Sequence, residues 1–181
     1  MLLYSTLGSS WGHGIEGFMT RIAVSACLLG EQVRYDGSHR LCRHVRDLLV
    51  ANDLEAVPFC PEQVMGVPRP PFQLHRTPTG QLQATQVGDG ASVLPQLQPS
   101  IEAIRSALTK KPLHGIICKS RSPSCGLKDV NYNTPQQEVG PGLFILAMQE
   151  LLPGVPIIDE NGVADSVQLA EFLRAVRNET E

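Results

Sequence analysis

Short apolar runs rich in β-branched residues alternate along this chain with longer stretches in which apolar residues recur every three or four positions. The short runs are typical of strands buried on both faces of a sheet, and they occupy residues 21–27, 54–59, 115–119 and 155–159. The longer stretches predict helices over residues 41–52, 99–111, 143–152 and 165–177. This alternation predicts an α/β fold, a Rossmann-like three-layer sandwich with a mostly parallel sheet.

Two parts of the chain lack this periodicity. Residues 67–99 are rich in proline, glutamine, glycine and threonine, which predicts a long excursion that forms a flap, with a small hairpin around Gly80. Residues 1–19 lack the charged start, the continuous apolar middle and the cleavage site of a secretory signal, so we expect a disordered extension or tag there. Residues 20–181 are then expected to form one domain.

The charge and hydropathy of the chain limit the classes of partner that it is expected to bind. The formal net charge is −3 at pH 7, whereas a protein that coats nucleic acid needs a basic face, so no nucleic-acid partner is expected. No apolar run approaches the roughly 20 residues that cross a bilayer, so no membrane partner is expected either. The oligomeric state is left open. One local basic cluster fits either a solvated helix face or a contact with a phosphate-bearing ligand: His39, Arg40, Arg43, His44 and Arg46.

The cysteines are the main candidates for chemistry. There are five of them, at positions 27, 42, 60, 118 and 125. An odd number without an export signal predicts a cytoplasmic protein in which structural disulfides do not form. No two cysteines form a C-x-x-C pair, so the usual sequence signature of a zinc ribbon or a thioredoxin-like site is absent.

The predicted fold brings three of these thiols to one edge. Cys27 and Cys60 end predicted strands, and Cys125 lies in the loop after the third strand. Parallel strands place their carboxyl ends along one edge of the sheet, where open α/β folds bind ligands, so the three thiolates could meet at a metal centre. The alternative is that all the cysteines simply fill the core, which is how we interpret Cys42 and Cys118.

Residues next to these thiols could activate water. Cys60-Pro61-Glu62 places a carboxylate two residues after one cysteine, and Ser122 and Ser124 stand beside Cys125. A carboxylate can take a proton from water and a hydroxyl can orient that water, which is the minimum equipment for hydrolysis. Alternatively, Glu62 is an acidic residue at the start of a helix, near free backbone amides.

Five motifs in the chain together resemble the thiouracil desulfidase family, which was formerly catalogued as a domain of unknown function. The motifs are Ser25-Ala-Cys27-Leu-Leu-Gly30, Arg34-Tyr-Asp-Gly37, Phe59-Cys60-Pro61-Glu62, Gly66-Val-Pro-Arg69 and Lys119-Ser-Arg-Ser-Pro-Ser-Cys125-Gly126. The resemblance implies a 4Fe-4S cluster held by three cysteines, with one iron that has no protein ligand. By position in the motifs, those cysteines are Cys27, Cys60 and Cys125.

The same resemblance implies a hydrolase-type enzyme that removes sulfur without net electron transfer. Its substrate would be a small thiolated pyrimidine, 4-thiouracil or the corresponding nucleoside or nucleotide, and its products uracil and hydrosulfide. Glu62 would act as the base for water and Ser122 would position that water, while Ser124 and Lys119 would contact the substrate. The motif spacing leaves open which of Ser120, Ser122 and Ser124 is catalytic.

Two other kinds of protein remain as alternatives. A non-catalytic iron–sulfur redox sensor or cluster carrier would use the same three cysteines and would not need Glu62. A cluster-free nucleotide-binding module would need a glycine-rich turn after the first strand, and Leu28-Leu29-Gly30 does not provide the G-x-G-x-x-G pattern.

Overall fold

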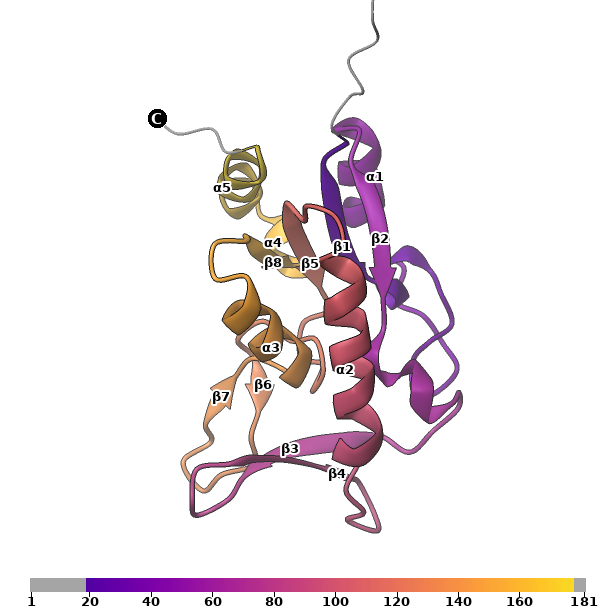
Figure 1. Cartoon of the computed structure of the whole chain (residues 1–181), viewed down its shortest axis with the longest axis vertical. Coiled ribbons are helices and arrows are strands. Elements are labelled where there is room, and N and C mark those ends of the chain that lie inside the picture. Colours follow the sequence, from indigo (N-terminus) through magenta and orange to yellow (C-terminus); the bar gives the residue numbers. More distant parts are fainter. Residues whose placement is uncertain (1–18, 178–181) are drawn as a thin grey trace, which may run out of the picture.

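A four-stranded sheet runs through the middle of the molecule (Figure 1). The computed structural model describes residues 19–177. The strands lie in the order β2, β1, β5, β8, and each neighbouring pair is parallel. Their bounds are Arg21–Ser25 for β1, Glu55–Phe59 for β2, Gly115–Cys118 for β5 and Ile157–Asp159 for β8. The predicted parallel sheet is therefore present, and all four carboxyl ends lie at one edge.

Helices cover both faces of this sheet, so the prediction of a three-layer α/β sandwich is confirmed. Successive strand residues point to opposite faces, and Ile22 and Val24 pack in one core while Ala23 packs in the other. The first core is closed by α1 (Arg43–Ala51), α4 (Glu160–Ala164) and α5 (Ser166–Val176). The second core is closed by α2 (Leu94–Leu108) and α3 (Leu143–Leu151).

Helix α2 differs most from its predicted bounds. The sequence pattern places its start at Pro99 or Ser100 and its end at Lys111, but the helix begins at Leu94 and ends at Leu108. Pro99 lies inside it, although a proline lacks the N–H group that an interior helical position normally donates. Leu97 is completely buried, and this packing of the early turns outweighs the one hydrogen bond that is lost.

All four strands are shorter than predicted, β2 and β5 by one residue each and the first and last by two. The first ends at Ser25, and the chain continues as a 3-10 turn, η1 (Ala26–Leu29), so Cys27 follows the strand instead of ending it. The last strand begins at Ile157 instead of Val155. These changes leave the order of elements intact.

The predicted hairpin around Gly80 is present, but it is a packed element and not a free flap. It consists of β3 (Phe72–Arg76) and β4 (Leu82–Gln86), with Leu74 and Ala84 fully buried. It lies at one end of the molecule, beside the first turns of α2 (Figure 1). A second, unpredicted pair of strands packs against β3: β6 (Val130–Asn131) and β7 (Val139–Gly140).

The N-terminal extension and the membrane expectation concern different parts of the chain. Residues 1–18 lie outside the described residues, so the predicted extension stays a prediction. Among residues 19–177, no helix has the length and apolar character that spanning a membrane requires.

Candidate functional site

A cavity of about 300 Å³ opens at the carboxyl edge of the sheet, where β1, β2 and β5 end. The three cysteines that the sequence analysis selected all line it, together with Glu62, Lys119 and Ser122. Cys27 and Cys125 are 9% and 6% exposed, and Cys60 is half-buried. The fold therefore brings together residues that are up to 98 positions apart, since the first is Cys27 and the last is Cys125.

Each cysteine stands on a short segment that follows a strand. Cys27 belongs to η1, directly after β1, and its carbonyl accepts the N–H group of Arg40 at 2.9 Å. Cys60 lies between β2 and η2 (Pro61–Met65), and its thiol donates to the Val33 carbonyl at 3.9 Å. Both cysteines are thus held on short turns at the carboxyl edge of the sheet, where their side chains line the cavity.

The Cys125 loop is fastened to the start of α3. The N–H groups of Leu143 and Phe144 donate to the carbonyls of Pro123 and Ser124 at 3.0 and 2.9 Å. These amides have no partner within the helix, so the loop takes the place of a cap. A Cβ atom on Gly142 would lie 2.5 Å from the Ser124 carbonyl group, which is why a glycine fits here.

Burial raises the pKa of all three thiols. It raises the pKa of Cys27 to about 11, and neighbouring Cys60 adds to this while Lys119 opposes it. Burial, followed by the charge of Glu62, raises the pKa of Cys60. The pKa of Cys125 lies well above its ordinary value because of burial and then the charges of Glu62 and the other two thiols. The three sulfur atoms are thus close enough to interact, and holding them as thiolates requires added positive charge.

This donor set fits an iron–sulfur cluster better than a single ion. Within residues 19–177, no three His, Cys, Asp or Glu side chains converge closely enough to hold one metal ion. A cluster instead binds each thiolate to a different iron, so its ligands stand around a volume and not around a point. The three thiols line one cavity and are each unfavourable as a bare thiolate, so they match the arrangement of ligands that a cluster needs.

Glu62 lies on the cavity wall in an ion pair. Its Oε2 accepts a hydrogen bond of 2.8 Å from Nη2 of Arg69, and the two side chains are 15% and 4% exposed. Glu62 also lies in the first turn of η2, as the alternative interpretation expected, but the hydrogen bond of its carboxylate is to Arg69. The Glu62 carboxylate therefore lines the cavity, and its Oε2 atom is held by Arg69.

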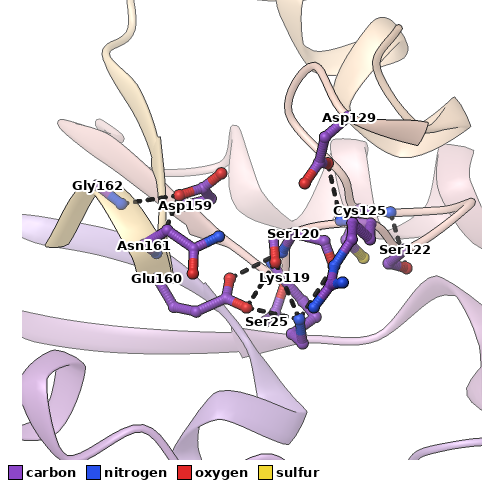
Figure 2. A network of polar contacts seen from close by, with 11 residues as sticks. Ser25, Lys119, Ser120, Ser122, Cys125, Asp129, Asp159, Glu160, Asn161 and Gly162 are labelled. Carbon is purple, nitrogen blue, oxygen red and sulfur yellow. Dashed lines mark hydrogen bonds and ion pairs between the residues drawn. The ribbon is translucent and has the colours of Figure 1, made fainter. Parts of the chain in front are cut away.

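The three serines of the Cys125 loop have different surroundings. Ser122 lines the cavity, and its Oγ accepts the N–H group of Cys125 at 3.2 Å (Figure 2). Ser120 is buried, and its hydroxyl donates to Glu160. Ser124 is fully buried outside the cavity lining, and its Oγ has no hydrogen-bond partner among the described residues. The structure thus brings Ser120 and Ser122, but not Ser124, to the cavity lining, and of these two the Ser120 hydroxyl already donates to Glu160.

Lys119 is held in a network that the sequence analysis missed. Its Nζ donates to Oε1 of Glu160 and to the carbonyl and hydroxyl oxygens of Ser120, so all three of its hydrogens have protein acceptors (Figure 2). Glu160 Oε2 also accepts the N–H group of Ser120 at 2.7 Å. Burial pushes the pKa of Glu160 upward, but the bonds from Lys119 and Ser120 outweigh it and lower the pKa.

Glu160 could have been suspected from its place in the sequence. It directly follows β8, whose carboxyl end lies at the same edge as those of β1 and β5. Asp159 accepts the N–H groups of Asn161 and Gly162 and so starts α4, which turns Glu160 toward the loop after β5. The sequence analysis did not select Glu160 because it predicted no helix that starts directly after the last strand.

Comparison with known proteins identifies the family. The family model described as 2-thiouracil desulfurase matches residues 22–160. The chain belongs to the 2-thiouracil desulfurase family. The solved structure of the [4Fe-4S]-dependent thiouracil desulfidase TudS is similar to it, with a TM-score of 0.63 and 28% sequence identity over 84% of this chain and 98% of that one. The uncharacterized protein YbbK of Bacillus subtilis (strain 168) is 27% identical over 161 residues, which cover 80% of this chain and 98% of YbbK.

The two remaining cysteines of this 2-thiouracil desulfurase family member lie outside the cavity lining. Cys118 is fully buried in β5, and Cys42 is half-buried at the residue before α1. Burial raises the pKa of Cys118 well above its ordinary value, to which nearby Asp159 adds. Both positions agree with cysteines that fill space.

Basic side chains form part of the cavity rim in this family member. Arg34, Arg40 and Arg121 line the cavity, and the last two are exposed. Among the described residues, no carboxylate pairs with Arg40 or Arg121. The Arg121 backbone has a φ of 54°, which is uncommon for a residue other than glycine, and its N–H group donates to Asp129 at 2.7 Å. This bond holds the loop that carries both Arg121 and Ser122.

Proposed function

We propose that this chain is an iron–sulfur-dependent desulfidase that replaces the sulfur of a thiolated uracil by oxygen without net electron transfer. The observation that carries the proposal is the shared cavity of about 300 Å³, which is lined by three thiols, the Glu62 carboxylate and the Ser122 hydroxyl. Membership of the 2-thiouracil desulfurase family and similarity to a [4Fe-4S]-dependent thiouracil desulfidase support the same chemistry. The proposed products are uracil and hydrosulfide.

Cys27, Cys60 and Cys125 would hold the 4Fe-4S cluster. Three protein ligands for four irons leave one iron without a protein ligand. When bound, the cluster supplies a Lewis-acidic site at that iron, whose affinity for soft sulfur favours a thiocarbonyl over a carbonyl. Lys119 provides a fixed positive charge close to Cys27, which helps to balance the negative thiolates.

Glu62 would deprotonate the attacking water, and Ser122 would orient it. Within the described residues, Oε2 of Glu62 is bonded to Arg69, whereas Oε1 has no hydrogen-bond partner and can accept a proton. Ser122 accepts the Cys125 N–H group, so its own hydroxyl hydrogen is free to orient a neighbouring oxygen. The water oxygen forms a bond to the ring carbon that carries sulfur, and one water proton passes to Glu62. The carbon–sulfur bond then breaks with its electron pair on sulfur, and the second water proton passes to sulfur to give hydrosulfide. Electrons stay paired throughout, so no oxidant or reductant is needed.

The arginines at the cavity rim indicate which form of the thiolated base would bind. We propose 4-thiouracil, or its nucleoside or nucleotide, and the unpaired arginines 40 and 121 favour a form with a phosphate group. Lys119 would act by its charge, because each of its hydrogens already has an acceptor. Substrate contact by Ser124 stays a prediction, and it requires the buried hydroxyl to turn toward the cavity.

One assay tests the proposal and separates it from the alternative. Anaerobically loaded protein is incubated with 4-thiouracil, 2-thiouracil or 4-thiouridine monophosphate, and hydrosulfide release is measured. We expect turnover of at least one 4-thio compound. Loaded protein that releases hydrosulfide from none of them would favour the non-catalytic sensor or carrier that the sequence also allows.

The role of Glu62 gives the sharpest variant. Glu62→Gln keeps the size of the side chain but removes the base, so we expect full iron content and a loss of turnover of about 100-fold or more. The matched control is Glu138→Gln, which breaks an ion pair with Arg76 outside the cavity lining and should leave turnover unchanged. Normal turnover by Glu62→Gln would remove this carboxylate from the mechanism.

A further inference from the structure

The short turn that carries Glu62 is not enough to fix its carboxylate. η2 is a 3-10 segment of five residues, and a glutamate side chain has several rotatable bonds whose freedom must be lost before its oxygen meets a water. Orientation matters for a catalytic base, because a misplacement of about 1 Å can reduce the rate about 100-fold. The carboxylate therefore needs a second contact that sets its direction.

Arg69 provides this contact from a fixed position. Its side chain is 4% exposed. Nη1 donates to the Gly66 carbonyl at 2.8 Å, and Nη2 donates to the Val33 carbonyl at 3.1 Å and to Glu62 Oε2 at 2.8 Å. The Arg69 N–H group also donates to the Tyr35 carbonyl at 2.8 Å. The guanidinium is thus tied to the segment after η1 and to the end of η2 at once.

The contact uses one oxygen of the carboxylate and leaves the other open. Arginine often binds a carboxylate with two parallel hydrogen bonds, which would occupy both oxygens. Here the guanidinium is shared with two carbonyl groups, and a single bond to Oε2 of Glu62 remains. Oε1 has no hydrogen-bond partner among residues 19–177, and the side chain lines the cavity.

A purely structural role for Arg69 would not require Glu62. The bonds from Arg69 to Gly66 and Val33 already join the two segments. The bond to Glu62 adds a constraint on a side chain that lines the same cavity as the three thiols. What this bond fixes is the direction of a carboxylate in the reaction cavity.

We propose that Arg69 is a positioning residue for the desulfuration reaction, which holds Oε2 of Glu62 so that Oε1 faces the water that is to be deprotonated. The inference rests on the proposed function. It assigns Arg69 no contact with the substrate. Loss of Arg69 should therefore lower kcat and leave KM nearly unchanged.

Arg69→Lys and Arg69→Met test this in anaerobically loaded protein, with rates expressed per loaded cluster. We expect kcat to fall about 10–100-fold in Arg69→Met, with partial recovery in Arg69→Lys, and KM to stay within about twofold. Iron content and the visible spectrum should match the wild type. The control is Arg76→Met, which breaks the Arg76–Glu138 pair and should leave kcat per cluster unchanged.

Two outcomes overturn the inference. The first is an unchanged kcat per cluster in Arg69→Lys and Arg69→Met, and the lysine variant alone decides the matter if the methionine variant does not fold. The second does not depend on turnover: crystal structures of the variants that show the Glu62 carboxylate in its wild-type direction. That readout keeps this inference separate from the proposed function, which fails if the wild-type chain is inactive.

Discussion

At the scale of single residues, surroundings divide the five cysteines into two groups. Cys27, Cys60 and Cys125 line the cavity beside Glu62, whereas Cys42 and Cys118 pack among apolar side chains. Exposure alone does not make this division, because Cys27, Cys118 and Cys125 are all buried. The difference is the space in front of the sulfur atom, which only the three-dimensional structure shows.

Alanine substitution of each cysteine should separate the groups. Cys27→Ala, Cys60→Ala and Cys125→Ala each remove one proposed ligand, so we expect loss of most of the bound iron after anaerobic reconstitution. Cys42→Ala and Cys118→Ala should keep iron content at the wild-type level, as measured by iron analysis and visible absorption. Iron loss in either of these last two variants would contradict the assignment of ligands.

At the scale of elements, the candidate site depends on contacts between loops and helix ends. Carbonyl groups of the Cys125 loop cap the first amides of α3, and the start of the same loop is held by Glu160 at the start of α4. Neither contact involves a strand residue of the sheet interior. The sheet therefore sets the edge, and helix starts set the loop that lies on it.

Gly142→Ala should disturb the Cys125 loop from the side of α3. An added Cβ would lie 2.5 Å from the Ser124 carbonyl group and 2.8 Å from the Cys125 nitrogen, both of which are backbone atoms. We expect a loss of about 1–3 kcal/mol in the free energy of unfolding and weaker iron retention, measured by urea titration and chelator challenge. Gly154→Ala is the control, since no atom lies within 4 Å of its Cβ position, and both properties should be unchanged there.

Glu160→Gln should weaken the other end of the loop in a pH-dependent way. The pKa of Glu160 is lowered in the folded chain, so the charged form stabilises the fold above its unfolded pKa of about 4.3 and this contribution is lost as the pH falls. We expect a loss of about 2 kcal/mol at pH 7 that shrinks below about pH 4, measured by urea titration. Glu102→Gln, in an exposed pair with Arg105, should show little change at either pH.

At the scale of the whole molecule, much of the fold could be predicted from the sequence and much of the site could not. Hydrophobic periodicity reports which face of a strand or helix is buried, so it gave the alternation of elements and the shared edge of Cys27, Cys60 and Cys125. Polar contacts between distant segments leave no periodic signal. The partnership of Lys119 with Glu160, 41 positions away, and that of Arg69 with Glu62 emerged only from the structure.

Loading with the cluster should change how the stability of the whole chain depends on pH. The raised thiol pKa values stabilise the apo chain below the unfolded value of about 8.5, and this is lost as the pH rises toward about 11 for Cys27. Each thiol contributes a slope of up to about 1.4 kcal/mol per pH unit. Urea titration at pH 7 to 10.5 should show this decline in the apo chain and a smaller one in the loaded chain. Equal slopes would contradict the ligand assignment.

The fastening of the Cys125 loop by later parts of the chain constrains when iron can be captured during biosynthesis. Leu143, Phe144 and Glu160 hold that loop, and all of them leave the ribosome after the last proposed cysteine ligand has been made. A nascent polypeptide that has emerged only as far as Cys125 contains all three proposed ligands but lacks the residues that hold the Cys125 loop in place. With the proposed ligands, we therefore expect cofactor insertion only after Leu143, Phe144 and Glu160 have been made.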